Sequence, residues 1–504
     1  MCQAARVGKS HPGRLLTCRR MNRLLLSMAG LALLGAGAAS PAVAVVSQGT
    51  FRMGADAAWA RGIDGSATRV AVLDPGFGGL DASIAAGELP PRGAMQEMSF
   101  DPVNGLEGRD NLGALTQHGT RMAEIVHDVA PGAQLVLVNY DDINGFLQAV
   151  EWIAANGIPV VSHSNSILGG PFDGTGPLAR AVDSAAARGV LWVNSAGNFA
   201  ERHWRGVPAP TGTEVPIAPA PGQTIAFGVG WNAPGLHAEI VVQRQQADGG
   251  WADVARSDAT RRTPPVTVDG GAWRVLVIRT AGGDAPVNVF SRTVGFGMFA
   301  VPDGSVATPG DAAGSLSVGA VPWQGSDPER YSSRGPTQDG RAKPDLVGPT
   351  YVTANPLFPG TAGTSASTAH VAGAAALIRH ERLAAGLPVD VPSLRADITR
   401  RARDLGARGP DAATGAGMAR VDVQAPRIAI SAPRGPRPLV RITAFDAGTM
   451  AAVELRLNGR IMRTAPGPHM RQRIWLRPGR NRVEVRARDL AGNQSVARRV
   501  LVRR

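Results

Sequence analysis

Cysteine is almost absent from this sequence. The 504 residues contain two cysteines, Cys2 and Cys18, and both precede the leader cleavage point inferred below. A mature chain without them cannot form disulfide bonds, so its stability has to come from packing and from any ions it binds.

Long hydrophobic runs are also scarce. One runs from Leu24 to Ala39, which is shorter than the about 20 residues that a spanning helix needs. The basic Arg23 precedes this run, and the small-residue pattern Ala42-Val43-Ala44 follows it. The arrangement predicts a signal peptide over 1–44 that is cleaved near Ala44, and hence a secreted protein, extracellular or periplasmic.

Alternatives for this leader stay open. The apolar run could remain as an uncleaved membrane anchor. Translation could also start at Met21. If residues 1–20 are translated, Arg19 and Arg20 could belong to a twin-arginine leader.

Acidic residues are scarce at both ends of the chain. Residues 1–44 contain six basic and no acidic residues, and residues 425–504 contain 18 arginines and four acidic residues. Such a tail could bind an anionic surface or polymer, including nucleic acid without sequence choice. Its aromatic residues are limited to Phe445 and Trp475, so we expect no specific nucleic-acid binding. A solubilising spacer is the alternative.

Apolar strands alternate with helices from about residue 66 to residue 200. Strands are predicted over 68–74, 133–140, 157–166 and 190–198, helices over 118–130, 143–155 and 176–189, and the pattern resumes at 307–321, 367–385 and 394–405. This alternation predicts a parallel sheet covered on both faces. Ligands of such sheets bind beyond the carboxyl ends of the strands, where Asp74 and Asn198 are expected.

Two other regions lack a good helical pattern. Residues 203–306 consist of short alternating segments between turn residues, which predicts an inserted β-sandwich. Residues 424–438 are rich in proline and read as an extended linker, and the segments after it alternate with the two-residue period of a small all-β domain.

Three segments each offer one reactive side chain. Asp74 ends a buried strand, His118 opens a helix before Gly-Thr, and Ser365 opens a helix within Gly-Thr-Ser. A serine becomes a useful nucleophile when a histidine takes its proton, and the histidine needs a carboxylate to orient it. Taken singly, each residue has a structural explanation, such as helix capping by Ser365. His163 ends a strand near the expected cleft and is a further candidate for substrate contact.

Together these motifs resemble a specific family. The segments "VAVLDPGFGG", "HGTRMAEIV", "NSAGN" and "GTSASTAHVAGAAALI" occur in the order Asp, His, Asn, Ser. They resemble the subtilisin-like serine proteases (peptidase S8) over about 55–202 and 307–424. The resemblance implies that Asp74 orients His118, that His118 acts as general base and then acid, and that Ser365 attacks the carbonyl. It also implies that Asn198 helps form the oxyanion hole.

The resemblance also suggests a domain organisation and a cleft. The expected parts are a signal peptide over 1–44, an α/β protease domain over 45–202 and 307–424, an inserted β-sandwich over 203–306, a linker over 425–438 and a basic immunoglobulin-like domain over 439–504. The strand that lines the substrate cleft is expected near 162–170, with Ser166, Gly169 and Gly170 contacting the peptide. The inserted β-sandwich could restrict or dock substrates, or be passive.

Several departures from the family leave alternatives. The segment "GTSAS" matches the acid-active sedolisins. Sedolisins, however, have a Glu in place of the catalytic His and an Asp in the oxyanion hole, whereas this sequence has His118 and Asn198 at these positions. These two residues favour near-neutral to alkaline activity. A catalytically inactive protein of this fold that binds surfaces is the other alternative. About ten residues separate Ala44 from the protease core, so we expect no propeptide.

The expected partners are protein or peptide substrates, with an anionic surface as a candidate partner of the basic tail, and the expected state is a monomer. No cofactor is expected to be required, and no metal-binding residues are assigned. Structural Ca²⁺ is common in the family, but no segment of the sequence predicts its site.

Overall fold

The computed structural model describes residues 44–110, 113–356 and 359–504. The signal peptide predicted over 1–44 therefore lies outside the described residues, except for Ala44. None of the described helices combines the length and the apolar character that crossing a membrane requires.

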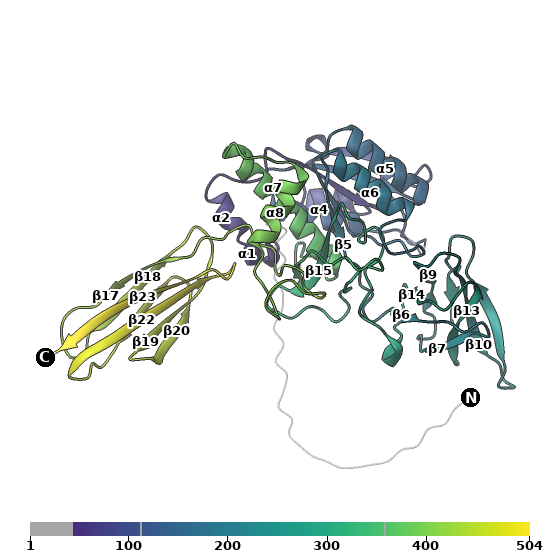
Figure 1. The fold of residues 1–504 in the computed structure, drawn as a ribbon. Helices are drawn as coiled ribbons and strands as arrows, with labels where there is room; N and C mark the ends of the chain where they lie inside the picture. Colours follow the sequence, from purple (N-terminus) through teal and green to yellow (C-terminus); the bar gives the residue numbers. More distant parts are fainter. Residues whose placement is uncertain (1–43, 111–112, 357–358) are drawn as a thin grey trace, which may run out of the picture. The chain divides into compact units, whose positions relative to one another are not determined.

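A seven-stranded sheet forms the centre of the structure (Figure 1). Its strands are β1 (Arg69–Asp74), β2 (Gln96–Phe100), β3 (Gln134–Tyr140), β4 (Val160–His163), β5 (Leu191–Ser195), β15 (Ser315–Pro322) and β16 (Leu346–Thr350). The order across the sheet is β16-β15-β5-β4-β1-β3-β2, and all neighbours are parallel. The predicted parallel sheet is therefore confirmed.

Helices cover both faces of this sheet. They are α1 (Gln48–Met53), α2 (Ala55–Trp59), α3 (Leu80–Ala85), α4 (His118–Val129), α5 (Ile143–Ala155), α6 (Pro177–Ala187), α7 (Thr364–Ala384) and α8 (Val391–Arg401), with short 3₁₀ turns at Arg92–Ala94, Gly105–Glu107 and Gly297–Phe299. Alternate residues of β1 pack on opposite faces. Val70 and Val72 join the core that contains α4 and α7, whereas Ala71 and Leu73 join the core that contains α5 and α6.

The strand order places β1 next to both β3 and β4. The connection that leaves β1 runs to β2 on one side, whereas the connection that leaves the neighbouring strand β4 runs to β5 on the other side, so the two connections diverge between β1 and β4. In open parallel sheets, ligands bind where connections diverge in this way, beyond the carboxyl ends of the strands. Asp74, the last residue of β1, lies at this end.

Short antiparallel strands fill residues 203–291. They are β6 (His203–Gly206), β7 (Thr213–Ile217), β8 (Thr224–Ile225), β9 (Phe227–Gly230), β10 (His237–Gln245), β11 (Trp251–Arg256), β12 (Val266–Thr267), β13 (Trp273–Ala281) and β14 (Val287–Ser291). They form sheets of four, three and two strands around a separate apolar core that includes Phe227, Ile240 and Val275. The alternating pattern therefore indicated β structure correctly.

The C-terminal residues form two antiparallel sheets. The strands are β17 (Arg427–Ser431), β18 (Leu439–Phe445), β19 (Met450–Leu457), β20 (Arg460–Pro466), β21 (His469–Arg473), β22 (Gly479–Asp489) and β23 (Gln494–Arg503). The linker predicted over 425–438 needs correction, because β17 lies within it and pairs with β18. Ile428 and Ile430 alternate with exposed residues and pack against the C-terminal core, which the proline content of this segment obscured. The immunoglobulin-like assignment stays a prediction.

Candidate active site

A short hydrogen bond joins Asp74 to His118. Asp74 is fully buried at the end of β1, and its Oδ2 lies 2.6 Å from His118 Nδ1. His118 is the first residue of α4, and its side chain is 33% exposed. The structure thus brings together two of the three predicted catalytic side chains, in the arrangement in which a carboxylate orients an imidazole.

The glycine after His118 permits this approach. A Cβ atom on Gly119 would lie 2.6 Å from the carbonyl oxygen of Gly76 and 2.9 Å from Asp74 Cβ. The N–H of Gly119 donates to that same Gly76 oxygen, at 3.0 Å. Because any larger residue would displace the start of α4 from β1, the small residue following the histidine is a geometric requirement.

Opposing effects act on the pKa of His118. Burial lowers it, whereas the charge of Asp74 and the hydrogen bond to Asp74 raise it by more, and Arg121 lowers it slightly. The net pKa of His118 lies above its ordinary value of 6.5. The imidazole is therefore a stronger base than an isolated histidine.

Ser365 lies at the start of α7, as predicted. Gly363, just before this helix, has φ of +109°, a conformation that side chains rarely adopt, and its N–H donates to Tyr331 and Thr350, each at 3.0 Å. Ser365 is 7% exposed, and its hydroxyl donates to the carbonyl oxygen of Ser164 at 3.0 Å. Among the described residues, no hydrogen bond joins Ser365 to His118.

Two consecutive residues connect Ser365 with the Asp–His pair. Ser164 accepts the bond from Ser365, and the next residue, Asn165, donates from Nδ2 to Asp74 Oδ2 at 2.9 Å. Asp74 and Ser365 therefore both contact the segment that follows β4, and His118 is connected to it through Asp74. The sequence analysis missed Ser164 and Asn165, although polar residues directly after a buried strand are a signal for this edge of the sheet.

Asn198 lies beside the start of α7. Its Oδ1 accepts hydrogen bonds from the backbone N–H and the hydroxyl of Thr364, both at 3.0 Å. These contacts turn Oδ1 of the amide toward Thr364 and Nδ2 away from it, and no described residue accepts a hydrogen bond from Nδ2. Thr364, another residue that the sequence analysis missed, is held by Ser195, whose Oγ lies 2.7 Å from Thr364 Oγ1.

The predicted substrate segment follows β4, next to the inserted strands. Ser166, Gly169 and Gly170 are all partly exposed. A Cβ on Gly169 would lie 2.6 Å from the carbonyl oxygen of Thr260, and a Cβ on Gly230 would lie 1.6 Å from that of Gly170. The inserted strands thus pack closely on Gly169 and Gly170, which leaves Ser166 as the predicted residue with no such neighbour among the described contacts.

Two other histidines of the α/β core, His163 and His370, are internal. His163 is fully buried between Tyr140 and Asn194, whose side chains lie 2.9 and 2.7 Å from its ring nitrogens, so the expectation that it contacts substrate is wrong. Burial lowers its pKa to about 4. His370 is also fully buried.

A hollow of about 390 Å³ opens beside His118. Arg121 and Met122 of α4 line one side of it, and residues 359–362, just before Gly363, line the other. The hollow therefore borders both the helix that begins at His118 and the loop that leads to Ser365.

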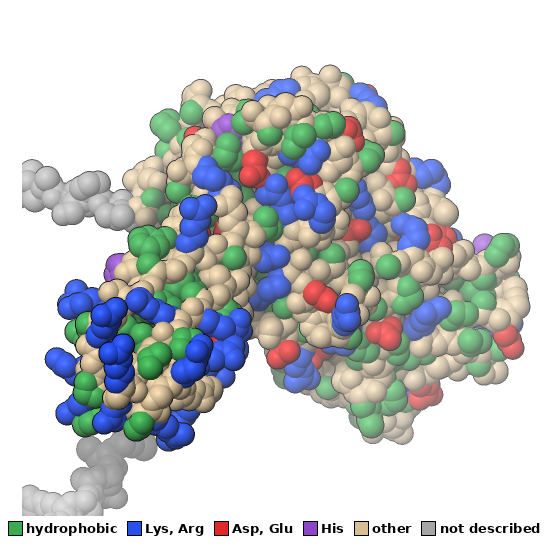
Figure 2. All heavy atoms as spheres, turned by 60° about the vertical axis from the view of Figure 1, so that its left-hand side comes forward, with side chains coloured by type: hydrophobic (Ala, Val, Ile, Leu, Met, Phe, Trp, Pro, Cys, Tyr) green, Lys and Arg blue, Asp and Glu red, His purple; other side chains and the backbone are tan. Residues whose placement is uncertain are grey.

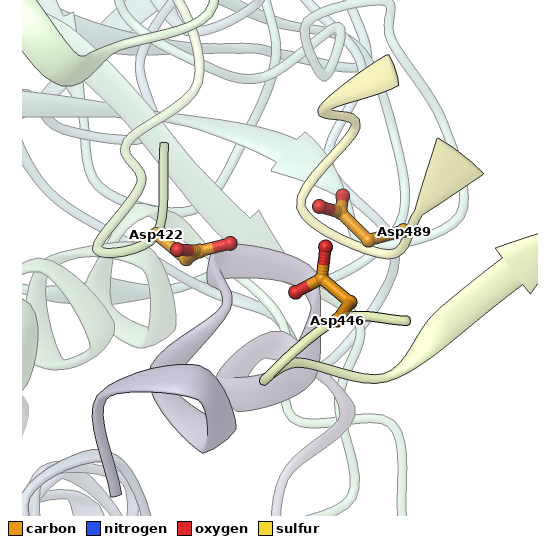
Figure 3. A group of neighbouring side chains, drawn as sticks. All are labelled: Asp422, Asp446 and Asp489. Atoms are coloured by element: carbon orange, nitrogen blue, oxygen red, sulfur yellow. The ribbon is translucent and has the colours of Figure 1, made fainter. Parts of the chain in front are cut away.

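Three carboxylates outside this site could hold a cation. Asp422, Asp446 and Asp489 each offer an oxygen, and these oxygens lie within 4.8 Å of one another (Figure 3). Burial raises the pKa of Asp489 to about 6, with smaller contributions from the charges of Asp446 and Asp422. Asn493 donates hydrogen bonds to both Asp422 and Asp489. Carboxylate oxygens are suitable ligands for Ca²⁺, but Asp422 and Asp489 already accept hydrogen bonds from Asn493.

Known proteins share this sequence pattern and fold. The model of the subtilase family matches residues 65–228 and 244–417. Subtilisin Savinase of Lederbergia lenta is 32% identical over 168 residues, which are 30% of this chain and 56% of the relative. The minor extracellular protease Vpr of Bacillus subtilis is 26% identical over 432 residues, which are 73% of this chain and 52% of Vpr.

The chain thus spans about half the length of these relatives. Among solved structures, the CspB protease of Clostridium perfringens has a TM-score of 0.53 at 16% identity, covering 73% of this chain and 96% of CspB, which shows a common fold. Because the family model matches well over half of the residues, the chain belongs to the subtilase family.

Proposed function

We propose that this protein is an exported serine endopeptidase that hydrolyses peptide bonds through Asp74, His118 and Ser365. The contact of 2.6 Å between Asp74 Oδ2 and His118 Nδ1 carries the proposal, because it fixes which nitrogen bears the proton and leaves Nε2 as a base. Membership of the subtilase family supports the same activity.

The proposed reaction begins with a rotation of the Ser365 side chain. The hydroxyl leaves the carbonyl of Ser164, to which it now donates, and turns its proton toward His118 Nε2. As Ser365 Oγ attacks the substrate carbonyl, His118 takes the proton and Asp74 stabilises the imidazolium. His118 then protonates the leaving amine, and a water molecule hydrolyses the acyl-enzyme by the same steps.

The negative charge of the tetrahedral intermediate needs donors. Asn198 Nδ2 is available because Thr364 holds the other end of the amide, and the Ser365 N–H lies in the first turn of α7. Backbone N–H groups of the first helical turn lack acceptors within the helix and carry partial positive charge. Loss of such an asparagine costs related proteases about 10²–10³ in kcat, and we expect a similar loss for Asn198→Ala.

The direct test is hydrolysis of an unfolded protein by the purified mature chain. The wild type should release peptides from it, whereas Ser365→Ala and His118→Ala should each reduce the rate by several orders of magnitude while remaining folded by circular dichroism. Absence of hydrolysis at every pH, acidic values included, would favour the inactive surface-binding alternative. Activity confined to acidic pH would favour the sedolisin-like one.

Secretion is the second part of the proposal. The leader predicted over 1–44 supports it, and so does the relative named as a minor extracellular protease. Expression of the full chain in a bacterial host should yield a secreted protein whose intact mass matches residues 45–504. A cell-bound product that retains the leader would support the anchor alternative.

The basic C-terminal strands support a third part, attachment to an anionic surface or polymer. Figure 2 shows basic side chains, which are all arginines in this part of the sequence, gathered over these strands. Glu484, one of the four acidic residues of the tail, forms ion pairs with Arg482, Arg486 and Arg498. Most arginines of the tail have no carboxylate partner among the described residues. Such an excess of cations binds anions at low ionic strength.

A further inference from the structure

The first described residues of the chain lie against buried acidic side chains. The backbone nitrogen of Val45 lies 3.3 and 3.1 Å from the two carboxylate oxygens of Glu88, which is 2% exposed. Two residues later, the N–H of Ser47 donates to Asp128 Oδ2 at 2.9 Å. Glu124, 1% exposed, interacts electrostatically with both Glu88 and Asp128.

The charge of Arg121 acts on Glu124, but among the described residues no ion pair compensates these three carboxylates. Within residues 44–110, 113–356 and 359–504, no Lys, Arg or His forms an ion pair with Glu88, Glu124 or Asp128. Burial raises the pKa of all three, that of Asp128 to about 8. Burying a charged carboxylate without a counter-ion lowers the stability of the folded protein, so a positive charge in this pocket would be stabilising.

The sequence supplies that charge at the required atom. Cleavage after Ala42-Val43-Ala44 adds one water across the Ala44–Val45 amide, leaves a carboxylate on Ala44 and turns the Val45 nitrogen into an α-amine that is protonated at neutral pH. A leader peptidase would perform this step. The nitrogen that becomes an ammonium is the one that already contacts both oxygens of Glu88.

We propose that Glu88, with Glu124 and Asp128 around it, is a binding site for the α-ammonium of Val45, which leader cleavage creates. The inference rests on the proposed secretion and on cleavage at Ala44, but not on catalysis. It makes maturation a stabilising event, because the new charge compensates carboxylates that form no ion pair among the residues the structure describes.

The site connects the two helices that carry the proposed catalytic residues. Asp128 and Glu124 belong to α4, which begins at His118. Glu124 also accepts a hydrogen bond of 2.8 Å from Asn355, which lies between β16 and α7.

A second link runs through Ser47 to α7. His370 of α7 donates from Nδ1 to the carbonyl of Ala366, so its Nε2 accepts from the Ser47 hydroxyl at 2.7 Å. Anchoring Val45 therefore fixes a segment that contacts both helices, and its release would loosen their connection.

The pH dependence follows from the charges that face the amine. Glu88 faces the amine directly, and Glu124 of α4 adds negative charge that Arg121 of the same helix opposes in part. Asp128, whose pKa is raised to about 8, adds its charge only as the pH approaches that value, and buried His370 is neutral because its pKa is lowered to about 4. The pairing raises the pKa of the amine above its ordinary value of about 7.7. The amine therefore carries its full charge below about pH 7.7, and the stabilisation that this charge contributes is lost as the pH rises through the raised value.

The test compares two forms of the chain in a Ser365→Ala background, which prevents self-digestion. One form begins at Val45, and the other keeps residues 40–44, so that the Val45 nitrogen stays an amide. Near pH 7 the form that begins at Val45 should unfold at a temperature about 2–4 °C higher. The difference should shrink above pH 9. Equal unfolding temperatures at pH 7 would overturn the proposal.

Glu88→Gln provides the matched variant. It should abolish the difference between the two forms, whereas Glu151→Gln, on the exposed surface of α5, should preserve it. A difference that survives in Glu88→Gln would assign the stabilisation to another group. The double comparison isolates the interaction between the amine and Glu88 from the separate effect of each change.

A chemical readout keeps the proposal testable if Glu88→Gln does not fold. Acetylation of the Val45 amine by trace acetic anhydride, followed by mass spectrometry across pH, reports its pKa and accessibility. The folded form that begins at Val45 should react more slowly than the form that begins at Ser40, with a higher pKa. Equal rates and equal pKa values would overturn the proposal. Neither readout uses catalysis, so an inactive enzyme could still confirm this site, and an active one could lack it.

Discussion

At the scale of single residues, the proposed site depends on how Asp74 is held. His118 and Asn165 both donate to Asp74 Oδ2, and Asp74 Oδ1 is buried without a hydrogen bond among the described residues. The carboxylate therefore owes its orientation to these two donors. Asn165 is a positioning residue in this account, because it acts on the substrate only through Asp74 and His118.

Asn165→Ala should therefore lower kcat while leaving KM nearly unchanged. A hydrogen bond to a charged group contributes about 1.5–3 kcal/mol, so a loss of about 10–100-fold in kcat is expected. Asn156→Ala, which changes an exposed asparagine at the end of α5, is the control and should keep the wild-type rate. Wild-type kcat in Asn165→Ala would show that Asp74 keeps its orientation without this donor.

The pKa of His118 sets the acidic limit of activity. His118 must be neutral to accept the proton of Ser365, and its pKa lies above 6.5 because Asp74 outweighs the effect of burial. The value of kcat/KM should therefore fall as the pH decreases through a pKa above 6.5.

Asp74→Asn checks the cause of that pKa. Removing the charge leaves burial as the main influence on His118, so the acidic limit should move to lower pH while the rate falls by about 10⁴. An unchanged acidic limit in the variant would assign the titration to another group.

At the scale of elements, the site depends on a close approach between the start of α4 and the end of β1. Gly119 makes the approach possible, since its missing Cβ would contact Gly76 and Asp74. Gly119→Ala should lower the free energy of unfolding by about 1–3 kcal/mol, the usual cost of overpacking. It should also reduce kcat about 10²-fold or more, because displacing a catalytic group by about 1 Å has that effect.

Gly93→Ala is the matched control for this substitution. Gly93 has no other residue within 4 Å of its absent Cβ, so an alanine there should change neither stability nor activity by a measurable amount. Urea unfolding and peptide hydrolysis measure both quantities on the same samples. Equal behaviour of the two variants would mean that α4 can shift without cost.

The sequence predicted the elements of the core well because each carries a local signal. Strand β1 is a continuous apolar run, α5 has its apolar residues on one face, and Asp74, His118 and Ser365 each stand at the end of such an element. Ser164 and Asn165 carry no comparable local signal, because their partners Ser365 and Asp74 lie 201 and 91 residues away.

Segments between elements were harder to predict for the same reason. The burial of His163 depends on Tyr140 of β3 and Asn194 of β5, which the sequence alone does not place beside it. Gly169 and Gly170 were read as open to a substrate, but the inserted strands pack against them. Neither contact has a periodic pattern that could reveal it.

At the scale of the whole molecule, charge is divided between an acidic body and a basic tail. Arg463, Arg471 and Arg473 are exposed on β20 and β21. Changing all three to Gln should make the protein leave an anionic resin at a lower salt concentration, because each removes a charge that binds the resin.

The control changes an equal number of exposed arginines outside the tail, namely Arg188, Arg205 and Arg330. It alters net charge by the same amount but should shift elution less. Equal shifts for the two triple variants would mean that net charge alone governs retention and that the tail is a spacer.

The central claim is that Ser365 is a nucleophile activated by His118. Reaction of the mature protein with a fluorophosphonate, followed by peptide mapping, tests it most directly. We predict one covalent adduct on Ser365, which forms faster as the pH rises through the pKa of His118 and is absent from Ser365→Ala. A folded protein that forms no adduct at any pH between 5 and 10, or one whose Ser365→Ala variant reacts equally well, would contradict the account.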